Sequence, residues 1–199
     1  MSSYETGAEP LAAQQESRRK SLLREVLETI LLTLAIYLAV NAATGRFRIQ
    51  GSSMEPTLHS GQFVITNKIA YMIGEPERGD IIVFIAPRSP TPAHEDDYIK
   101  RVIGLPGENV TVSGGQVMVN GVALDEPYIA DAPHYTRSWT VGLDEYFVLG
   151  DNRNSSNDSH DWGMLKREAI LGKAWLIYWP PGEWGLAPNH AEYAAAGGG

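Results

Sequence analysis

The chain has 199 residues, of which 43% are hydrophobic and 20% charged, enough for one folded domain with appendages. Its formal net charge of -8, without a Lys/Arg cluster in the body of the chain, argues against a nucleic-acid-binding surface. Because cysteine is absent, thiol nucleophiles, disulfides and thiolate zinc sites are excluded, so catalysis must use oxygen, nitrogen or carboxylate groups.

The N-terminal part of the chain predicts a membrane anchor. Residues 1–17 are mostly polar or small and lack an apolar period, so we expect them to be disordered. Residues 26–43 form a run of 18 residues with a single charge, which is just long enough to span a bilayer. We therefore expect a cytoplasmic segment at 1–25 and a transmembrane anchor at 26–44.

Charges around the anchor predict its orientation. Four basic residues precede it, namely Arg18, Arg19, Lys20 and Arg24. Only Arg46 and Arg48 follow it closely, so the positive-inside rule predicts a single-pass protein of the cell membrane, with a cytoplasmic N-terminus and an extracytoplasmic domain. A buried core helix is disfavoured because the apolar face runs all round the helix. A cleavable signal peptide is the other alternative, since Val40-Asn41-Ala42 satisfies the small-residue cleavage rule.

Residues 45–185 predict a mainly β, antiparallel domain. Short β-rich runs alternate with turn residues, most clearly at 63–66, 81–85, 110–112, 116–119, 146–149 and 174–179. Asn120-Gly121 predicts a type I′ hairpin turn, and we expect residues 107–135 to form a small projecting β-ribbon. Residues 186–199 are expected to be a flexible tail.

The segment 51–58, Gly-Ser-Ser-Met-Glu-Pro-Thr-Leu, is the first with side chains able to do chemistry. Its small residues expose the backbone and Pro56 fixes a turn, which leaves the hydroxyl of Ser53 beside backbone N–H groups. Such groups can form an oxyanion hole. An ordinary Ser/Thr-rich turn is the simpler interpretation of this segment alone, because a nucleophilic serine also needs a base.

The segment 97–108 contains a candidate base. If it is a strand, alternation sends Tyr98 and Lys100 to one face and Ile99 and Arg101 to the other, so Lys100 can face inward. Burial lowers the pKa of a lysine and converts it to an amine that can accept a proton from serine. A solvated lysine on an edge strand is the alternative.

A dense polar loop at 149–163 follows a predicted strand. Such a loop is typical of a binding site or of a network of Asx turns. Calcium is disfavoured because Arg153 stands where a ligand would be needed and no glycine follows at the required offset. We expect no metal site.

These three segments, in this order after an anchor, resemble the type I signal peptidase family over about residues 26–179. Residues 53–58 resemble the nucleophile motif of that family, and residues 98–107 its lysine motif. Gly79-Asp80 with the strand after it resembles a further motif, and the loop resembles the C-terminal motif through residues 150–153, Ser156, Asp158 and Ser159. The resemblance implies a membrane-bound serine endopeptidase with the β domain of signal peptidases.

The resemblance also implies the chemistry. Ser53 attacks the carbonyl at the end of the signal sequence of an exported preprotein, and Lys100 serves first as general base and then as general acid. Ser156 stands where the family uses a hydroxyl to orient the lysine. The implied partners are preproteins and the lipid bilayer. We expect no nucleic acid, no metal and no organic cofactor, and a protein that works as a monomer.

Supporting residues follow from the same resemblance. Asp158 supports the C-terminal motif, and Arg101 pairs with Asp151 to hold the lysine strand against the loop. One departure concerns the oxyanion hole. Some members have a serine two residues before the nucleophile, whereas this chain has Gly51 there, so the backbone N–H groups of Ser53 and Gly51 are expected to supply the hole.

Substrate preference follows from shallow apolar pockets that admit only small side chains, as in Ala-x-Ala sites. By resemblance, the residues expected to line these pockets are Phe47, Ile49, Met54, Leu58, Tyr98 and Ile99. Ordinary core packing is the alternative for each of them. The peptide is expected to bind as an added β-strand.

Two other functions are open at this point. The first is a Ser/His/Asp hydrolase that uses His160 with Asp158 or Asp161; many family members have arginine where this chain has His160. The second is a non-enzymatic anchored β module that binds a partner through tryptophans, which are Trp139, Trp162, Trp175, Trp179 and Trp184.

Overall fold

The computed structural model describes residues 11–87 and 97–189 and divides the chain into two compact units, Met1–Ala42 and Ala43–Gly199. The expected disorder of residues 1–10 and the expected tail beyond residue 189 lie outside the described residues.

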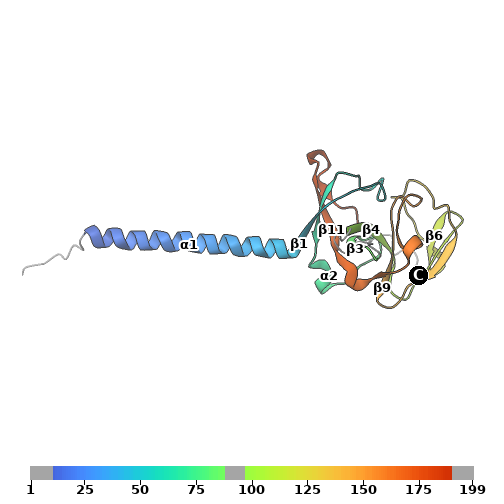
Figure 1. Ribbon diagram of the computed structural model, residues 1–199, viewed down its shortest axis with the longest axis horizontal. Helices are drawn as coiled ribbons and strands as arrows, with labels where there is room; N and C mark the ends of the chain where they lie inside the picture. The colour runs from blue at the N-terminus through green and yellow to red at the C-terminus, as the bar shows by residue number, and fades with distance from the viewer. Residues whose placement is uncertain (1–10, 88–96, 190–199) are drawn as a thin grey trace, which may run out of the picture. The chain divides into compact units, whose positions relative to one another are not determined.

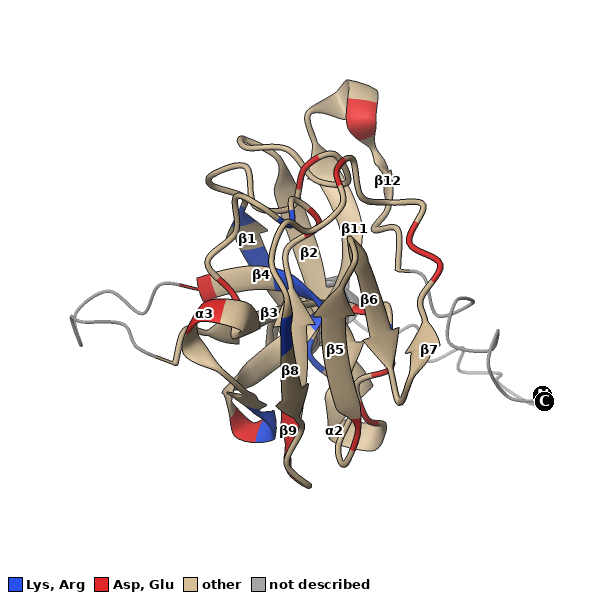
Figure 2. Ribbon diagram, turned by 90° about the vertical axis from the view of Figure 1, so that its right-hand side faces the viewer, with Lys and Arg blue, Asp and Glu red and all other residues tan. Residues whose placement is uncertain are grey.

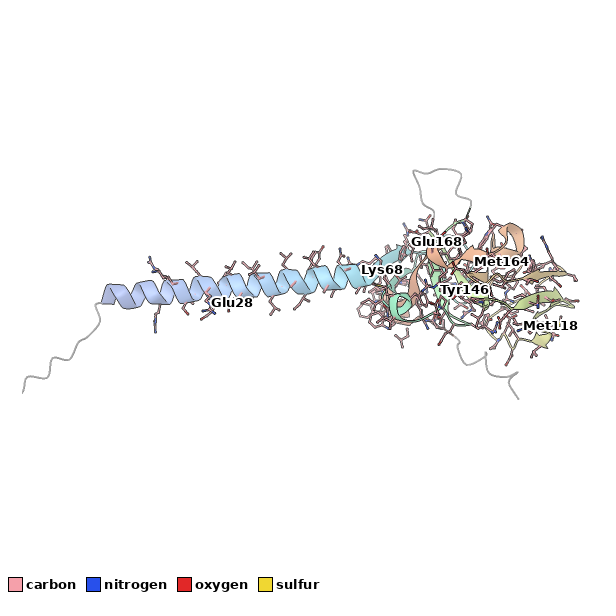
Figure 3. The ribbon with its side chains drawn as sticks, turned by 90° about the horizontal axis from the view of Figure 1, so that it is seen from below. Glu28, Lys68, Met118, Tyr146, Met164 and Glu168 are labelled. Atoms are coloured by element: carbon pink, nitrogen blue, oxygen red, sulfur yellow. The ribbon has the colours of Figure 1, made fainter. Side chains whose placement is uncertain are left out.

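Helix α1 (Leu11–Ala43) makes up nearly all of the first unit that is described (Figure 1). The prediction of disorder for residues 11–17 is wrong, because this stretch consists mainly of the strong helix formers Leu, Ala, Gln and Glu. The most apolar stretch between Arg18 and Ala43 has a mean hydropathy of 1.9, and none of its residues is buried. The helix is therefore long and apolar enough to cross a membrane. Glu28, labelled in Figure 3, pairs with Arg24 at 2.7 Å, which lowers the cost of a charge near lipid.

The second unit is mainly antiparallel β, as expected. Among the described residues, eight strands form the larger sheet: β1 (Thr44–Arg48), β2 (Phe63–Asn67), β3 (Ile81–Ile85), β4 (Asp97–Gly104), β9 (Glu145–Leu149), β10 (Leu165–Lys166), β11 (Ile170–Trp179) and β12 (Gly185–Leu186). Their order is β1-β2-β11-β3-β4-β9-β10, with β12 paired to β11. Figure 1 shows β11, β3 and β4 next to one another, although β11 comes last of the three in the chain.

Strand β3 explains why part of this sheet is apolar throughout. Ile81 joins one hydrophobic core, whereas Ile82 and Phe84 join another, so both faces of the strand are covered. Such a strand reads as a continuous apolar run in the sequence, as residues 81–85 do.

The expected β-ribbon is broader than a ribbon and does not project freely. It belongs to a four-stranded sheet of β5 (Asn109–Ser113), β6 (Gln116–Val119), β7 (Val122–Ala123) and β8 (Arg137–Thr140), in the order β7-β6-β5-β8 (Figure 2). Its turn residues Asn120 and Gly121 have φ of 50° and 84°, as a type I′ turn requires. The valines of β5 and β6 share a core with Ile103 and Phe147 of the larger sheet, so burial of this apolar face holds the two sheets together.

The C-terminal boundary lies later than predicted. Residues 186–189 are ordered: Ala187 is buried, and the side chain of Asn189 accepts from the N–H of Ile81 at 2.7 Å and donates to the carbonyl of Ala174 at 2.9 Å. One asparagine therefore joins the last described residues to β3 and β11. Short helical turns complete the unit: α2 (Ala70–Ile73), α3 (Ser159–Trp162), η1 (Arg167–Ala169) and η2 (Pro181–Glu183).

Candidate active site

Ser53 lies in a tight turn whose neighbouring apolar side chains are buried in a hydrophobic core. Gly51 begins the turn with φ of 81°, a conformation that glycine adopts at little cost. The N–H of Leu58 donates to the carbonyl of Met54 at 2.9 Å, and the side chains of both residues are buried beside Ile49 in the hydrophobic core. Burial of these side chains fixes the backbone on which Ser53 stands.

Lys100 comes to Ser53 from the buried face of β4. Its Nζ donates to Ser53 Oγ at 2.7 Å and to the carbonyl of Ile99 at 2.9 Å, and it lies 5.3 Å from the ring centre of Tyr98. The side chains of Tyr98 and Lys100 are thus neighbours, as alternation along a strand predicts.

Burial makes Lys100 a usable base. Only 4% of the residue is exposed, and this desolvation lowers its pKa to about 8, although the charges of Asp158 and Asp151 act in the opposite direction. At pH 7 roughly one such lysine in ten is a neutral amine, against about one in three thousand for an ordinary lysine.

Gly150 allows the polar loop to approach the turn that carries Ser53. A Cβ at this position would overlap with Ser156 Oγ and with the carbonyl oxygen of Ser53. Asn152 then fixes the turn twice: its N–H donates to the carbonyl of Ser53 at 3.0 Å, and its side-chain amide donates to that of Ser52 at 3.2 Å. The close approach therefore depends on a residue without a side chain.

Ser156 lies against Gly150, as the carbonyl of Ser53 does, but it is not hydrogen-bonded to Lys100. Its Oγ is buried and has no hydrogen-bond partner within the part of the chain that the structure describes. The amine of Lys100 is directed instead to Ser53 and to the carbonyl of Ile99. The structure thus brings Ser156 next to the turn that carries Ser53, with its hydroxyl unpaired among the described residues.

Asp158 organises the polar loop, as expected. It is fully buried, and its Oδ2 accepts from the N–H of Gly150 at 2.9 Å. Its Oδ1 accepts from the N–H of His160 at 3.1 Å and lies 2.7 Å from His160 Nδ1, which makes Asp158 the N-cap of α3. A buried carboxylate needs several donors, and these supply them.

The expected pair of Arg101 and Asp151 is present and fully buried. Arg101 Nε donates to Oδ1 at 2.9 Å and Nη2 to Oδ2 at 2.7 Å, a two-pronged contact. Arg101 Nη1 also donates to the carbonyls of Gly79 at 2.9 Å and Pro188 at 3.0 Å. The guanidinium therefore joins the lysine strand to the loop and to the ordered C-terminal residues.

A second buried ion pair was not predicted. Arg153 contacts the carboxylate of Glu126 through Nη1 at 2.7 Å and Nη2 at 2.6 Å, and its Nε donates to the carbonyl of Gly150 at 3.1 Å. Tyr128 lies near both arginines, with its ring centre 4.1 Å from Arg101 and 5.9 Å from Arg153. No local pattern predicts a partner for Arg153, because Glu126 is 27 positions away in another loop.

A cleft of about 640 Å³ is lined by Ser53 and Lys100. Two chain segments, 46–53 and 97–100, form most of its lining, together with Val83, Ser155 and Asn157. Of the expected substrate residues, four line the cleft: Phe47, Ile49, Tyr98 and Ile99. The other two, Met54 and Leu58, lie in the hydrophobic core at 1% and 0% exposure, so for them the core-packing interpretation fits the structure better.

The cleft offers backbone groups as well as side chains. Strand β1 stands at one end of the sheet order, so one of its edges has no partner strand among the described residues. Ser53 and Gly51 also line the cleft, and no hydrogen bond within residues 11–87 and 97–189 is donated by the N–H of Ser53. The geometry can thus accept an extended peptide and place a carbonyl near this N–H.

His160 does not face Ser53 as a catalytic base would. Its Nδ1 is 2.7 Å from Asp158 and its Nε2 is 3.2 Å from Asp161, so both ring nitrogens face carboxylates. The hydrogen bond that His160 makes to Asp158 is the main reason that the pKa of His160 is raised. This arrangement does not support a Ser/His/Asp triad, whereas Lys100 is already in contact with Ser53.

The tryptophans divide into two groups. Trp139 and Trp162 pack against hydrophobic cores, which fits a structural role. Trp175, Trp179 and Trp184 are 52%, 51% and 68% exposed. A five-tryptophan binding surface is therefore not present.

Comparison with known proteins places this site in a family. The profile described as signal peptidase, peptidase S26, matches residues 23–179. A probable signal peptidase I-2 of Synechocystis sp. is 48% identical over 168 residues, covering 81% of this chain and 75% of the relative. Signal peptidase I of Leptolyngbya laminosa is 42% identical over 193 residues, covering 92% and 93%. A crystal structure of a signal peptidase I from Enterococcus faecalis is 34% identical, covers 50% of this chain and 97% of its own, and has a TM-score of 0.43. The matched residues include Ser53, Lys100 and the whole polar loop, and the chain belongs to the signal peptidase family, peptidase S26.

Proposed function

We propose that this chain removes N-terminal signal peptides from exported preproteins, with Ser53 as nucleophile and Lys100 as general base. The observation that carries the proposal is the 2.7 Å contact between Lys100 Nζ and Ser53 Oγ at a lysine that is 4% exposed. Membership in a family of serine peptidases supports the same reaction class.

The first half of the reaction uses the neutral amine of Lys100. It takes the proton of Ser53 as Oγ attacks the scissile carbonyl, and the resulting oxyanion needs hydrogen-bond donors. We assign the N–H of Ser53, which has no partner in the described structure, as the first donor to the oxyanion. We assign the N–H of Gly51 as the second donor. Lys100 then returns the proton to the leaving amine, which frees the mature protein and leaves an ester on Ser53.

The second half consumes water. Lys100 removes a proton from a water molecule that attacks the ester, and Ser53 regains its proton as the signal peptide leaves. We assign to Ser156 the role of orienting the amine during the steps in which Lys100 is not bonded to Ser53. Its buried hydroxyl without a partner supports this role, since an unsatisfied buried hydroxyl is costly unless it is used.

The substrate binds as an extended strand in the cleft beside β1. Phe47, Ile49, Tyr98 and Ile99 supply apolar surface near the nucleophile, and Val83 adds to it. Such a lining suits the small side chains of Ala-x-Ala sites at the first and third positions before the cut.

The anchor places this reaction at the membrane. The basic cluster at 18–24 precedes the apolar helix and only Arg46 and Arg48 follow it closely, which supports a cytoplasmic N-terminus and an extracytoplasmic catalytic domain. In this orientation the domain meets preproteins on the side to which they are exported. We propose that one chain is sufficient, because Ser53 and Lys100 come from the same chain.

The test is cleavage of a preprotein with an Ala-x-Ala site by the detergent-solubilised full chain. Ser53→Ala and Lys100→Met are the variants, and a preprotein with a bulky residue in place of the second alanine is the substrate control. We expect cleavage by the unmodified chain alone and only at the Ala-x-Ala site. Equal processing by the unmodified chain and by Ser53→Ala would falsify the proposal.

A further inference from the structure

His160 lies outside the proposed dyad but in contact with a residue that acts on it. It stands on α3, with 22% of its side chain exposed. Its charged neighbours are Asp158 at 2.7 Å from Nδ1, Asp161 at 3.2 Å from Nε2, and Arg137, whose guanidinium donates to the carbonyl of His160 at 3.4 Å. The ring of Tyr135 stacks on the imidazole with 4.5 Å between centroids and 14° between planes.

The positions of the two carboxylates favour the imidazolium. A neutral imidazole has one donor nitrogen and one acceptor nitrogen, whereas both nitrogens of His160 face carboxylate oxygens. Only the doubly protonated ring has an N–H on both nitrogens and a positive charge that both carboxylates attract. The raised pKa of His160 has the same origin, with the hydrogen bond to Asp158 as its largest cause and burial as the main opposing one.

A chain of contacts leads from this ring to the nucleophile. Asp158 holds His160 through one oxygen and the N–H of Gly150 through the other, at 2.9 Å. Gly150 in turn packs directly against Ser156 Oγ and the carbonyl of Ser53. A change at His160 therefore reaches the turn that carries the nucleophile through a single buried carboxylate.

We propose that His160 is a positioning residue for the Ser53 and Lys100 pair, and that its positive charge offsets the charge of Asp158 that Lys100 would otherwise face. With His160 protonated, Asp158 stabilises the ammonium form of Lys100 less, so Lys100 loses its proton more readily. When His160 is neutral or removed, the uncompensated carboxylate keeps the proton on Lys100 to higher pH. The proposal rests on the proposed function of Lys100 as base.

The first experiment is the pH dependence of kcat/KM for preprotein cleavage by His160→Gln and His160→Arg, with His134→Gln as the control for an exposed histidine. On the acid side of this profile kcat/KM rises with pH, and we call that part the acid limb. We expect His160→Gln to move the acid limb to higher pH by about 0.5–1 unit. We expect His160→Arg, which keeps the cation, to leave the limb where it is or to move it downward, and His134→Gln to leave it unchanged. Equal effects of glutamine and arginine, or a limb that neither variant moves, would contradict the proposal.

The second experiment needs no activity, because it measures the protonation of His160 itself. The pKa of the imidazole is measured by NMR in the unmodified chain and in Lys100→Met, with His160→Gln used to assign its resonance. Coupling between titrating groups is reciprocal, so removing the Lys100 ammonium raises the pKa of His160 by a similar amount, about 0.5–1 unit. An unchanged pKa refutes the coupling even if cleavage proceeds as proposed. If the pKa of His160 shifts but the unmodified chain cleaves no preprotein, the proposed function is refuted and the coupling between His160 and Lys100 stands.

Discussion

The Nζ of Lys100 lies 2.7 Å from the Oγ of Ser53, although 47 positions of sequence separate the two residues. Strand β4 supplies the lysine and a turn after β1 supplies the serine, so the contact exists only in the folded domain. The same burial that makes Lys100 a base also opposes folding, because a desolvated ammonium is unfavourable. Activity and stability are therefore expected to oppose each other at this residue.

Lys100→Met is expected to abolish cleavage and to stabilise the fold. Because the folded pKa of Lys100 is about 8 and its unfolded pKa about 10.5, the unfolded chain binds more protons between these values. The buried charge therefore lowers the free energy of unfolding by its full amount below pH 8, and this destabilisation disappears as pH rises toward 10.5. We expect the free energy of unfolding at pH 7 to increase by on the order of 2–3 kcal/mol, with a smaller gain at pH 10.

Urea unfolding of the full chain in detergent at both pH values measures this difference, and Lys166→Met, at an exposed lysine, is the control. A Lys100→Met variant that is less stable than the unmodified chain at pH 7 would show that the contacts of Lys100 outweigh its desolvation.

The pH dependence of cleavage is expected to follow Lys100. The base must be neutral, so kcat/KM for a preprotein rises about tenfold per pH unit below pH 8 and levels off above it. The profile between pH 5.5 and 10 provides the measurement. A half-maximum near pH 6 would instead indicate a histidine base and would revive His160 as a candidate.

The sequence was sufficient where the chemistry depends on local pattern. Alternation along residues 97–101 placed Lys100 on an inward face, and the structure has it 4% exposed. The valine runs of β5 and β6 and the Asn120-Gly121 turn were also readable, since hairpins depend on neighbouring residues. The position of Ser53 followed from its motif, which combines residues adjacent in the chain.

The sequence was insufficient where a residue's role depends on distant partners. Met54 and Leu58 are apolar residues in a turn, and no local pattern distinguishes a pocket wall from a core anchor. Arg153 and Glu126 become partners only in the folded domain, where Arg153 also donates to the carbonyl of Gly150 and lies near the ring of Tyr128. The ordered residues after 185 escaped prediction for the same reason, since distant residues hold them, among them Ile81 through Asn189 and Arg101 through Pro188.

Gly150→Ala is expected to reduce kcat/KM at least 100-fold, because its Cβ would push Ser156 and the carbonyl of Ser53 out of place. Gly182→Ala is the matched control, since no atom lies within 4 Å of the added Cβ there. Parallel assays and melting curves of both variants measure the effect. Full activity of Gly150→Ala would mean that the loop can retreat without disturbing the nucleophile.

Asp151→Asn is expected to affect stability and the pKa of Lys100 separately. It leaves the buried guanidinium of Arg101 without its carboxylate, which costs about 3–5 kcal/mol. It also removes a negative charge that raises the pKa of Lys100, so the acid limb of the pH profile moves downward. Urea unfolding and the pH profile of the same variant test both effects, and an upward move of the limb would contradict the electrostatic account.

Two serines of the loop allow structural and catalytic roles to be separated. Ser159 Oγ accepts from the N–H of Val148 at 3.0 Å, so Ser159→Ala leaves a buried donor unpaired and lowers stability by about 1–3 kcal/mol. Ser156 Oγ has no partner among the described residues, so Ser156→Ala is expected to leave stability unchanged or slightly increased. If its hydroxyl orients Lys100 during the reaction, kcat falls about 10–100-fold while the melting temperature holds. Unchanged kcat for Ser156→Ala would reduce Ser156 to a packing residue and leave Ser53 and Lys100 as the whole of the proposed catalytic machinery.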